Sequence, residues 1–244
     1  MEIKKDYLYS FIISFLFFCL YLYLSPPAII FGDSPELILA SYTLGIAHPP
    51  GYPLYSILTR AFHYLIPFIS YDRACNIFSI FVSSVSLFIF FTTLRKINIS
   101  LLISILVTIT LGFSEVYIKQ SLISEVYSLN NFFFTLSFYI IVSYYFNNDK
   151  RKIFLAFFIT GVGLANHHTL LSVFIIEILF FIILYGRDLK TVLISLLFFL
   201  LGLTVYLYLP FRSKANPALD WGDPESLDSF LDVILRKQFG FGGG

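Results

Sequence analysis

Long apolar stretches recur along almost the whole chain, and they limit its possible folds more than any other feature of the sequence. Only 13% of the 244 residues carry a formal charge, against roughly a quarter in soluble domains. Most of the stretches approach the roughly 20 residues that a helix needs to cross a bilayer. We therefore predict an all-α, polytopic integral membrane protein with about seven transmembrane helices. The predicted spans are 7–24, 74–94, 97–113, 126–146, 153–167, 169–185 and 191–209.

Two further stretches, both in the loop after the first span, are predicted to be helices that lie at the membrane interface. The stretch 53–68 is apolar, but Arg60 and His63 interrupt it and a proline stands near each end, which favours an interfacial helix over a span. The second interfacial helix is expected at about 34–45. The first span itself follows two lysines, as in a signal peptide, yet no small-residue cleavage site follows it, so we predict an uncleaved helix.

Basic residues mark alternate junctions between the spans and thereby predict the orientation of the chain. They are Lys4, Lys5, Arg95, Lys96, Lys150, Arg151, Lys152, Arg187 and Lys190. The positive-inside rule places these junctions and the N-terminus in the cytoplasm. The opposite loops contain all four histidines and most of the acidic residues, so we expect the chemically active groups at the extracytoplasmic face. The formal net charge of +1 argues against a nucleic-acid partner.

The chain divides into a transmembrane core, 1–209, and an external loop, 210–244. The loop ends in the glycine-rich run 239–244, which is an unusual end for a membrane protein. We therefore expect the loop to be truncated and the natural chain to continue beyond it.

The first external loop contains Asp33 and Glu36 in the sequence Gly-Asp-Ser-Pro-Glu. One interpretation is a helix start, with Ser34 as the N-cap, Pro35 at the first helical position and Glu36 favourable in the first turn. The other interpretation is catalytic, because a carboxylate held just above the bilayer can act as general base toward an acceptor hydroxyl. Capping is the more common role of such a motif, and the residues alone leave both open.

A histidine stands on a stiff loop in the same segment. His48 is followed by Pro49-Pro50-Gly51-Tyr52-Pro53, and this proline-rich sequence leaves the backbone few accessible conformations. Such a loop either reverses the chain or positions His48 as a titratable group near Asp33. Both interpretations fit the sequence equally well.

Two later external segments carry further polar groups. Glu125 and Tyr127 stand at the start of a predicted span, where Glu normally serves the helix dipole and Tyr normally anchors the helix. Asn166, His167 and His168 lie between two spans. Adjacent histidines point about 100° apart on a helix and do not chelate, so we predict hydrogen bonding to a phosphate or a sugar there, and no metal site.

Arg212 and Lys214 are basic residues on the predicted external side, against the positive-inside trend. Arginine can hold a lipid phosphate through two hydrogen bonds, although a snorkelling cation is the alternative. Trp221 suits the interface and can also stack on a sugar. Glu177 falls in the middle of a span, where a charge costs about 3 kcal/mol or more, so we expect it to be protonated or paired and assign it no function.

Seven motifs in order give the chain a resemblance to a known family. They are GDSPEL, AHPPGYPLY, NIFS, SEVYSLN, GLANHHTLL, LYLPFRS and WGDP, and they cover nearly the whole chain. The chain resembles the GT-C glycosyltransferases whose eukaryotic members are endoplasmic-reticulum protein O-mannosyltransferases of plexin-type receptors. The resemblance implies a GT-C-like helical bundle, a polyprenyl-phosphate-linked sugar as donor, and an acidic catalytic residue in the first external loop. By motif position the catalytic residue is Asp33 with Glu36 in support, and the pocket positions are His48, Glu125, His167, His168 and Arg212.

The chain departs from that family in two respects. Relatives usually have a tryptophan in the third external segment near Tyr117, where this chain has Ser-Glu-Val-Tyr. Relatives also continue well past residue 244 with more helices and often a soluble domain, so part of acceptor recognition is expected outside this sequence.

The leading hypothesis is a membrane glycosyltransferase that moves a mannose-like sugar from a polyprenyl-phosphate donor to a hydroxyl of a protein or glycan acceptor. In an inverting scheme Asp33 takes the proton of the acceptor, while Arg212 and a histidine hold the leaving phosphate. The expected substrate-binding residues are His48, Tyr52, Glu125, Tyr127, Asn166, His167, His168, Arg212, Lys214 and Trp221. No cofactor is required by this scheme, and a divalent metal is left open but not predicted.

Two alternatives belong to other functional classes. A transporter or lipid-handling protein would need paired ionisable groups in the membrane and repeated, interrupted helices, and only Glu177 fits that pattern. An inactive assembly subunit is the third hypothesis. The frequent Ile, Phe, Lys and Asn suggest an AT-rich genome, so the expected location is a bacterial inner membrane rather than the endoplasmic reticulum.

Overall fold

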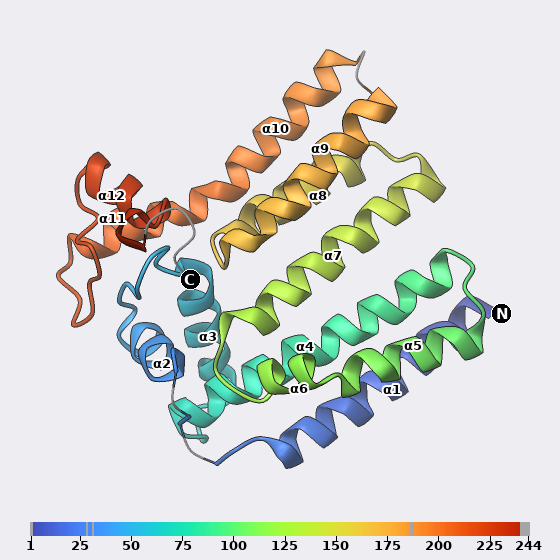
Figure 1. Ribbon diagram of the computed structural model, residues 1–244, viewed down its shortest axis with the longest axis horizontal. Helices are drawn as coiled ribbons and strands as arrows, with labels where there is room; N and C mark the ends of the chain where they lie inside the picture. The colour runs from blue at the N-terminus through green and yellow to red at the C-terminus, as the bar shows by residue number, and fades with distance from the viewer. Residues whose placement is uncertain (1, 28, 31, 186–187, 240–244) are drawn as a thin grey trace.

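Helices make up nearly all of the regular structure of the chain (Figure 1). The computed structural model describes residues 2–27, 29–30, 32–185 and 188–239. Within them, extended pairing is limited to a single bridge between Ile46 and Asp220. The helices are α1 (Glu2–Leu24), α2 (Ser34–Thr43), α3 (Pro53–Leu65), α4 (Tyr71–Lys96), α5 (Leu101–Phe113), α6 (Glu115–Ser121), α7 (Val126–Asn147), α8 (Arg151–Leu164), α9 (Leu171–Tyr185), α10 (Leu189–Leu203), α11 (Tyr208–Ser213) and α12 (Leu227–Ile234), with 3-10 turns at His168–Leu170, Thr204–Leu207 and Lys237–Phe239.

Every apolar run in the sequence forms a helix, which confirms the all-α, multi-pass membrane class. In the described part of the chain, four helices are long and apolar enough to cross a membrane by themselves, and they are Lys5–Leu24, α4, α7 and Leu189–Ser213, the last combining α10 and α11. The pair α5 and α6 meets at 63° and adds a fifth span if it is counted as one.

The predicted count of seven full spans is higher than helix length supports. Helix α8 has 14 residues and α9 has 15, and a rise of about 1.5 Å per residue gives each a length of only about 22 Å. A bilayer core is about 30 Å thick. The predicted fifth span, 153–167, is shortened because the chain leaves the helix after Leu164, before the Asn-His-His motif.

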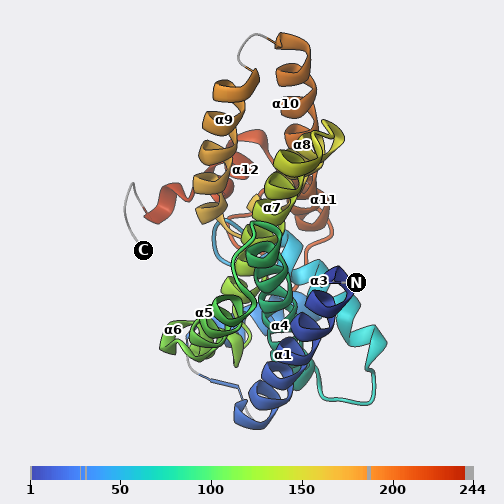
Figure 2. The same cartoon turned by 90° about the vertical axis from the view of Figure 1, so that its right-hand side faces the viewer.

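The long helices form two groups that α7 joins (Figure 2). On one side α4 packs between α1 and α7, and on the other side α8 packs between α7 and α10. Helices α8 and α10 approach closely at Gly161 and Gly202, where a Cβ atom on Gly202 would lie 2.7 Å from the backbone nitrogen of Val162. Small residues at such a crossing let helix backbones pack without a hydrophobic driving force.

Glu177 lies in the middle of the second group and is 1% exposed. Its Oε1 atom accepts a hydrogen bond of 2.7 Å from the Thr160 hydroxyl of α8 and another from the Ser137 hydroxyl of α7. The carboxyl group therefore links three helices, as expected for an ionisable group that the membrane forces to find partners.

The helix junctions gather at two opposite ends of the molecule. At one end, which we call the basic end, Arg95 of α4 forms an ion pair with Asp6 of α1 at 2.8 Å. Lys150, before α8, forms another with Asp188, before α10, at 2.7 Å. All the described basic residues of the orientation pattern lie at this end, so the two-sided arrangement predicted from the sequence is present.

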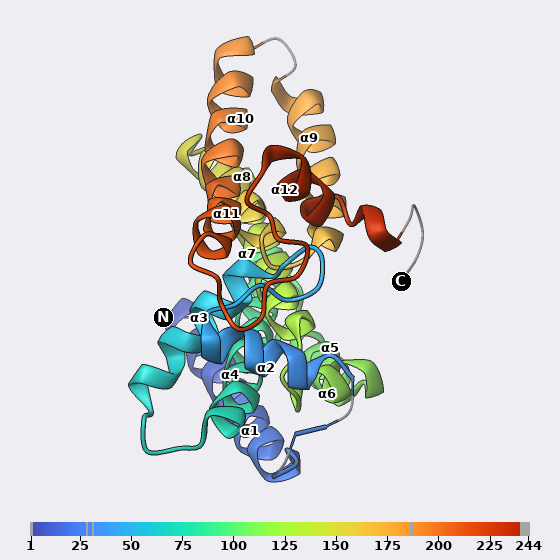
Figure 3. The same cartoon turned by 90° about the vertical axis from the view of Figure 1, so that its left-hand side faces the viewer.

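Helices α2, α3, α11 and α12 cover the other end, which we call the loop end (Figure 3). The stretch after the last span returns to the first loop here. Ile46 donates its backbone N–H to Leu219 O at 2.8 Å, and Trp221 donates to Ile46 O at 3.2 Å. The guanidinium of Arg212 donates to the carbonyl oxygens of Leu44 (2.6 Å) and Thr43 (3.0 Å) at the C-terminal end of α2. These contacts hold the two segments of the loop end against each other.

Candidate active site

Asp33 occupies the N-cap position of α2, so the prediction that Ser34 caps this helix is wrong. Gly32 has a φ of 117°, a conformation that glycine tolerates, and it brings the chain into the helix start. Asp33 has helical backbone angles rather than the extended ones from which a cap side chain reaches the helix N–H groups, and its carboxylate makes no capping bond. The Ser34 hydroxyl instead donates to Glu125 Oε1 at 3.5 Å.

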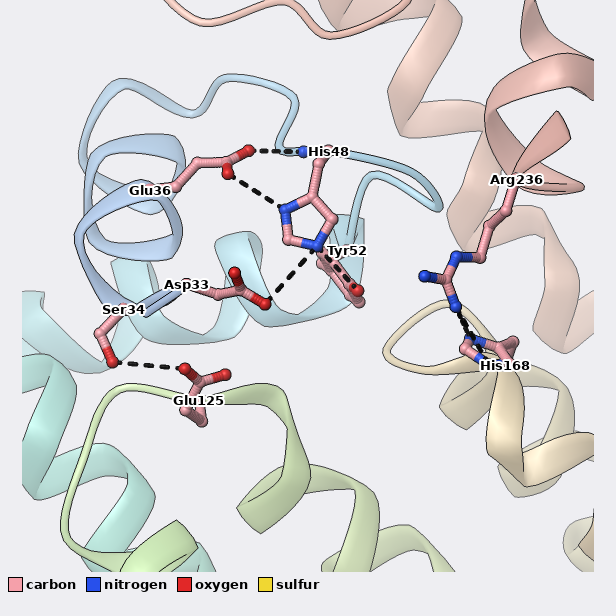
Figure 4. Close-up of polar contacts among 8 residues, drawn as sticks. All are labelled: Asp33, Ser34, Glu36, His48, Tyr52, Glu125, His168 and Arg236. Carbon is pink, nitrogen blue, oxygen red and sulfur yellow. Dashed lines mark hydrogen bonds and ion pairs between the residues drawn. The ribbon is translucent and has the colours of Figure 1, made fainter. Parts of the chain in front are cut away.

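The Asp33 side chain remains 60% exposed and points toward His48 (Figure 4), with 3.8 Å between its Oδ2 atom and Nε2 of the ring. The first interpretation of the Gly-Asp-Ser-Pro-Glu motif therefore does not hold, because no side chain caps the start of α2. A carboxylate in this position is accessible to an incoming hydroxyl group.

Glu36 holds His48 in a fixed orientation. The backbone N–H of His48 donates to Glu36 Oε1 at 2.6 Å, and Nδ1 of the ring lies 3.1 Å from Oε2. Because a carboxylate only accepts, Nδ1 carries a proton. The hydrogen bond to Glu36 raises the pKa of His48. Burial of Glu36 acts to raise the pKa of that carboxyl group, but the contacts with His48 outweigh burial and lower it.

Tyr52 connects His48 to the histidines of a distant loop. Its hydroxyl lies 3.2 Å from His48 Nε2, and its ring stacks on that of His167 with 6.1 Å between centroids. Tyr52 adopts a positive φ of 44° directly before α3, and the adjacent Gly51 packs against Leu209 of the last span. The stiff loop predicted from the prolines therefore positions both His48 and Tyr52.

Glu125 provides a second carboxyl group beside Asp33. It stands directly before α7 and is 8% exposed. Burial, and then the nearby negative charge of Asp33, raise the pKa of Glu125 to about 7. Neighbouring carboxyl groups that differ in environment can take different roles, one as a base and the other as a hydrogen-bond donor.

His167 lies in the turn between α8 and α9 and is largely buried. Its Nδ1 atom accepts a hydrogen bond of 3.3 Å from the backbone N–H of Thr169, so the neutral ring carries its proton on Nε2. Burial, together with the adjacent His168 and Arg236, lowers the pKa of His167 to about 4. Tyr127 packs against this ring at 5.2 Å between centroids. Predicted site residues from three segments that are separate in the sequence thus meet around His167.

Asn166 contributes to the same turn from within the protein. It is fully buried, and its side-chain nitrogen donates to Val126 O at 3.0 Å. This bond ties the turn after α8 to the start of α7, where Glu125 and Tyr127 stand. Asn166 therefore positions the site rather than lining it.

Arg236 belongs to the site and was missed in the sequence. Its Nη1 atom lies 3.2 Å from Nε2 of His168, opposite the carboxylates of Asp33 and Glu125 (Figure 4). It reaches the site because the chain folds back after α12. Arg236 breaks the positive-inside trend just as Arg212 does, so the same criterion could have identified it.

Arg212, Lys214 and Trp221 lie elsewhere at the loop end. Arg212 contacts the C-terminal end of α2, and a ten-residue helix of about 15 Å separates that end from Asp33. Lys214 is exposed directly after α11, and Trp221 is exposed beside Ile46. The structure therefore gives Arg212 a structural position at the end of α2, and brings Arg236 to the site.

No three His, Cys, Asp or Glu side chains among the described residues lie close enough together to hold a metal ion. The candidate site consists of carboxyl groups, imidazoles and phenols at the loop end, with the guanidinium of Arg236 beside them. Such a set can accept a proton from a hydroxyl group on one side and hold an anion on the other.

The model of the family described as "Protein O-mannosyl-transferase TMEM260 N-terminal domain" matches residues 33–192. The protein O-mannosyl-transferase tmem260 of Dictyostelium discoideum is 31% identical over 235 residues, which cover 88% of this chain and 29% of that protein. The protein O-mannosyl-transferase TMEM260 of Mus musculus is 33% identical over 219 residues, which cover 86% of this chain and 31% of that protein. This chain therefore spans less than a third of the length of these relatives. No solved structure matches it.

Proposed function

The chain belongs to the protein O-mannosyl-transferase TMEM260 N-terminal domain family, and from this we propose that it carries the active site of a membrane glycosyltransferase. The matched region begins at Asp33 and includes the carboxylate, histidine and tyrosine positions of the candidate site. The two relatives are named for O-mannosyl transfer, and both are much longer than this chain. The reaction and its substrates therefore form part of the proposal.

The proposed donor is a mannose-like sugar linked to a polyprenyl phosphate, and the acceptor is a hydroxyl group of a protein. The site residue Glu125 stands directly before the long apolar helix α7, at the loop end of that span. A lipid-linked phosphate resides at this depth in a bilayer, so the donor can approach from the membrane while the acceptor approaches from the water.

Asp33 is the proposed general base, and one observation carries this role. Its carboxylate is accessible, makes no capping bond and lies beside a histidine that Glu36 orients. The acceptor oxygen attacks the anomeric carbon, its proton passes to Asp33, and the bond from that carbon to the phosphate oxygen breaks. The sugar is transferred with inversion, and polyprenyl phosphate leaves.

Arg236 and His168 are the proposed contacts for the leaving phosphate, in place of Arg212. A guanidinium can donate two parallel hydrogen bonds to phosphate oxygens, and negative charge on that group grows as the bond breaks. Arg236 stands on the side of the site opposite Asp33 (Figure 4). This arrangement separates the base from the leaving group, as an in-line displacement requires.

The site is proposed to face the extracytoplasmic compartment, which is the lumen if the membrane is that of the endoplasmic reticulum. The positive-inside pattern supports this orientation, and the two relatives come from eukaryotes. In full-length protein without its native cysteines, a cysteine introduced by Glu225→Cys should react with an impermeant reagent added from outside sealed cells or from the lumen of microsomes. A cysteine introduced by Lys152→Cys should not react with the reagent. Labelling at position 152 but not at position 225 would overturn the proposed orientation.

The catalytic test is Asp33→Asn in the full-length protein, assayed by transfer of labelled sugar from a polyprenyl-phosphate donor. We expect transfer to fall at least about a thousandfold, because the base is lost while the shape is retained. Asp72→Asn is the matched control, since Asp72 is acidic and at the same end but outside the site. Retained transfer in the Asp33 variant would refute the proposal.

A further inference from the structure

A cavity of about 360 Å³ opens at the basic end, opposite the candidate active site. Helices α4 and α7 run in the same direction and diverge toward this end (Figure 1). The cavity lies at their C-terminal ends and is completed by the first turns of α1, since Tyr7, Lys96 and Tyr139 all line it. Its volume falls in the range of roughly 300–1,000 Å³ that is usual for small-molecule sites.

Among the described residues that line this cavity, Lys96 is the cation that forms no ion pair. Asp6 and Arg95 also line it, but they pair with each other at 2.8 Å, and the Arg95 guanidinium donates in addition to Ile99 O at 2.5 Å. For Lys96, the contact found in the described residues is with the ring of Tyr139, 5.6 Å from its centroid. A lysine ammonium over a ring still has hydrogens to donate to an anion.

The remaining lining groups are suited to oxygen atoms. The phenols of Tyr7 and Tyr139 and the side chain of Asn98 line the same space. Phenol and amide groups donate hydrogen bonds, so an anion near Lys96 would find several donors. A basic residue at the end of a span is common, but it does not by itself explain a cavity with this lining.

The position of the cavity indicates which anion fits. Lys96 is the last residue of the span Tyr71–Lys96, so its ammonium lies at the depth of lipid headgroups. We propose that this cavity binds the phosphate of an anionic membrane lipid, with Lys96 as the counter-charge and Tyr7, Tyr139 and Asn98 as hydrogen-bond donors. Basic pockets between spans commonly hold acidic headgroups.

The test uses the purified full-length protein and counts bound lipid by native mass spectrometry. Phosphatidylglycerol is the anionic probe, phosphatidylcholine the zwitterionic control, and inorganic phosphate the competitor. We expect Lys96→Gln to weaken phosphatidylglycerol binding about fivefold, while phosphatidylcholine binding stays unchanged. Tyr139→Phe, which keeps the ring, should weaken binding less.

Lys190→Gln is the matched control, because Lys190 is an exposed lysine at the same end, outside the cavity. Equal loss of binding in both lysine variants would show general surface attraction and overturn the proposal. Binding of inorganic phosphate with the same dependence on Lys96, but no bound lipid, would overturn the lipid assignment. Thermal melting reports whether each variant folds. Sugar transfer is not measured here, so a negative result leaves the Asp33 proposal untouched.

Discussion

The two ends of the molecule hold their charged groups in different ways. At the basic end, carboxylates pair one to one with cations, as Asp6 does with Arg95. At the loop end, the carboxyl groups of Asp33 and Glu36 share the imidazole of His48, and Asp33 remains largely exposed. One-to-one pairs join helices, whereas an incompletely neutralised group retains the capacity to take up a proton. Perturbed, shared charges of this kind are typical of functional sites.

After Asp33→Asn, the largest effect is expected when the Glu36 carboxylate that orients His48 is removed. Glu36→Gln should lower the turnover number about a hundredfold, because the ring loses its fixed orientation. Since Glu36 raises the pKa of His48, the inflection of the pH–rate profile due to His48 should also move to lower pH. Glu225→Gln is the control, and an unchanged pH profile would contradict the role of Glu36.

Arg236 and Arg212 are both basic residues of the loop end, but they should respond differently. Arg236→Ala should raise the KM for the lipid-linked donor about tenfold with little change in melting temperature, because it removes a phosphate contact. Arg212→Ala should lower the melting temperature instead, since the carbonyl groups at the end of α2 lose their donor. If Arg212→Ala raised the KM and Arg236→Ala lowered the melting temperature, Arg212 rather than Arg236 would be the phosphate contact.

Glu125 should make the stability of the loop end depend on pH. Its pKa is raised from 4.5 to about 7, so the fold favours the protonated form. The stabilisation is complete below the unfolded pKa and is lost as the pH rises through about 7. The melting temperature should therefore fall by a few degrees as the pH rises from about 4.5 to about 7, and Glu125→Gln should reduce that fall. An equal slope in the variant would exclude Glu125 as its source.

The smallest effect is expected from a pair at the basic end. Asp6→Asn should reduce the free energy of unfolding by only about 0.5 kcal/mol, because partly exposed ion pairs contribute little. Sugar transfer should be unchanged when assayed at saturating donor. Chemical denaturation of the detergent-solubilised protein measures the first quantity, and a loss of transfer would show that the two ends are coupled.

The helices and their two-sided arrangement could be predicted from the sequence, because both follow from local composition. Apolar length sets the helices, and basic residues mark their junctions. Four or five helices of the described residues qualify as spans by length, against about seven predicted, because α8 stops at the polar turn before His167. A turn of this kind ends a helix through its hydrogen bonds, which a scan for apolar residues does not detect.

The roles of the site residues were harder to predict from the sequence, because they depend on partners that are distant in the chain. The hydroxyl of Ser34 looked like a cap, yet it bonds to Glu125, which is 91 residues away. Arg212 lies at the end of the last span and Arg236 follows that span, and only the path of the chain after α12 brings Arg236 rather than Arg212 to the site. Both outcomes are tertiary effects that override local preference.

The contacts between Ile46 and Trp221, and between Thr43 and Arg212, join segments that emerge from the ribosome far apart in time. The first loop therefore cannot complete these contacts until the last described span has followed it. Until then α2 lacks the donors at its C-terminal end, and Asp33 lacks a guanidinium opposite it. The candidate site is therefore assembled only after the segment that carries Arg236 has been synthesised.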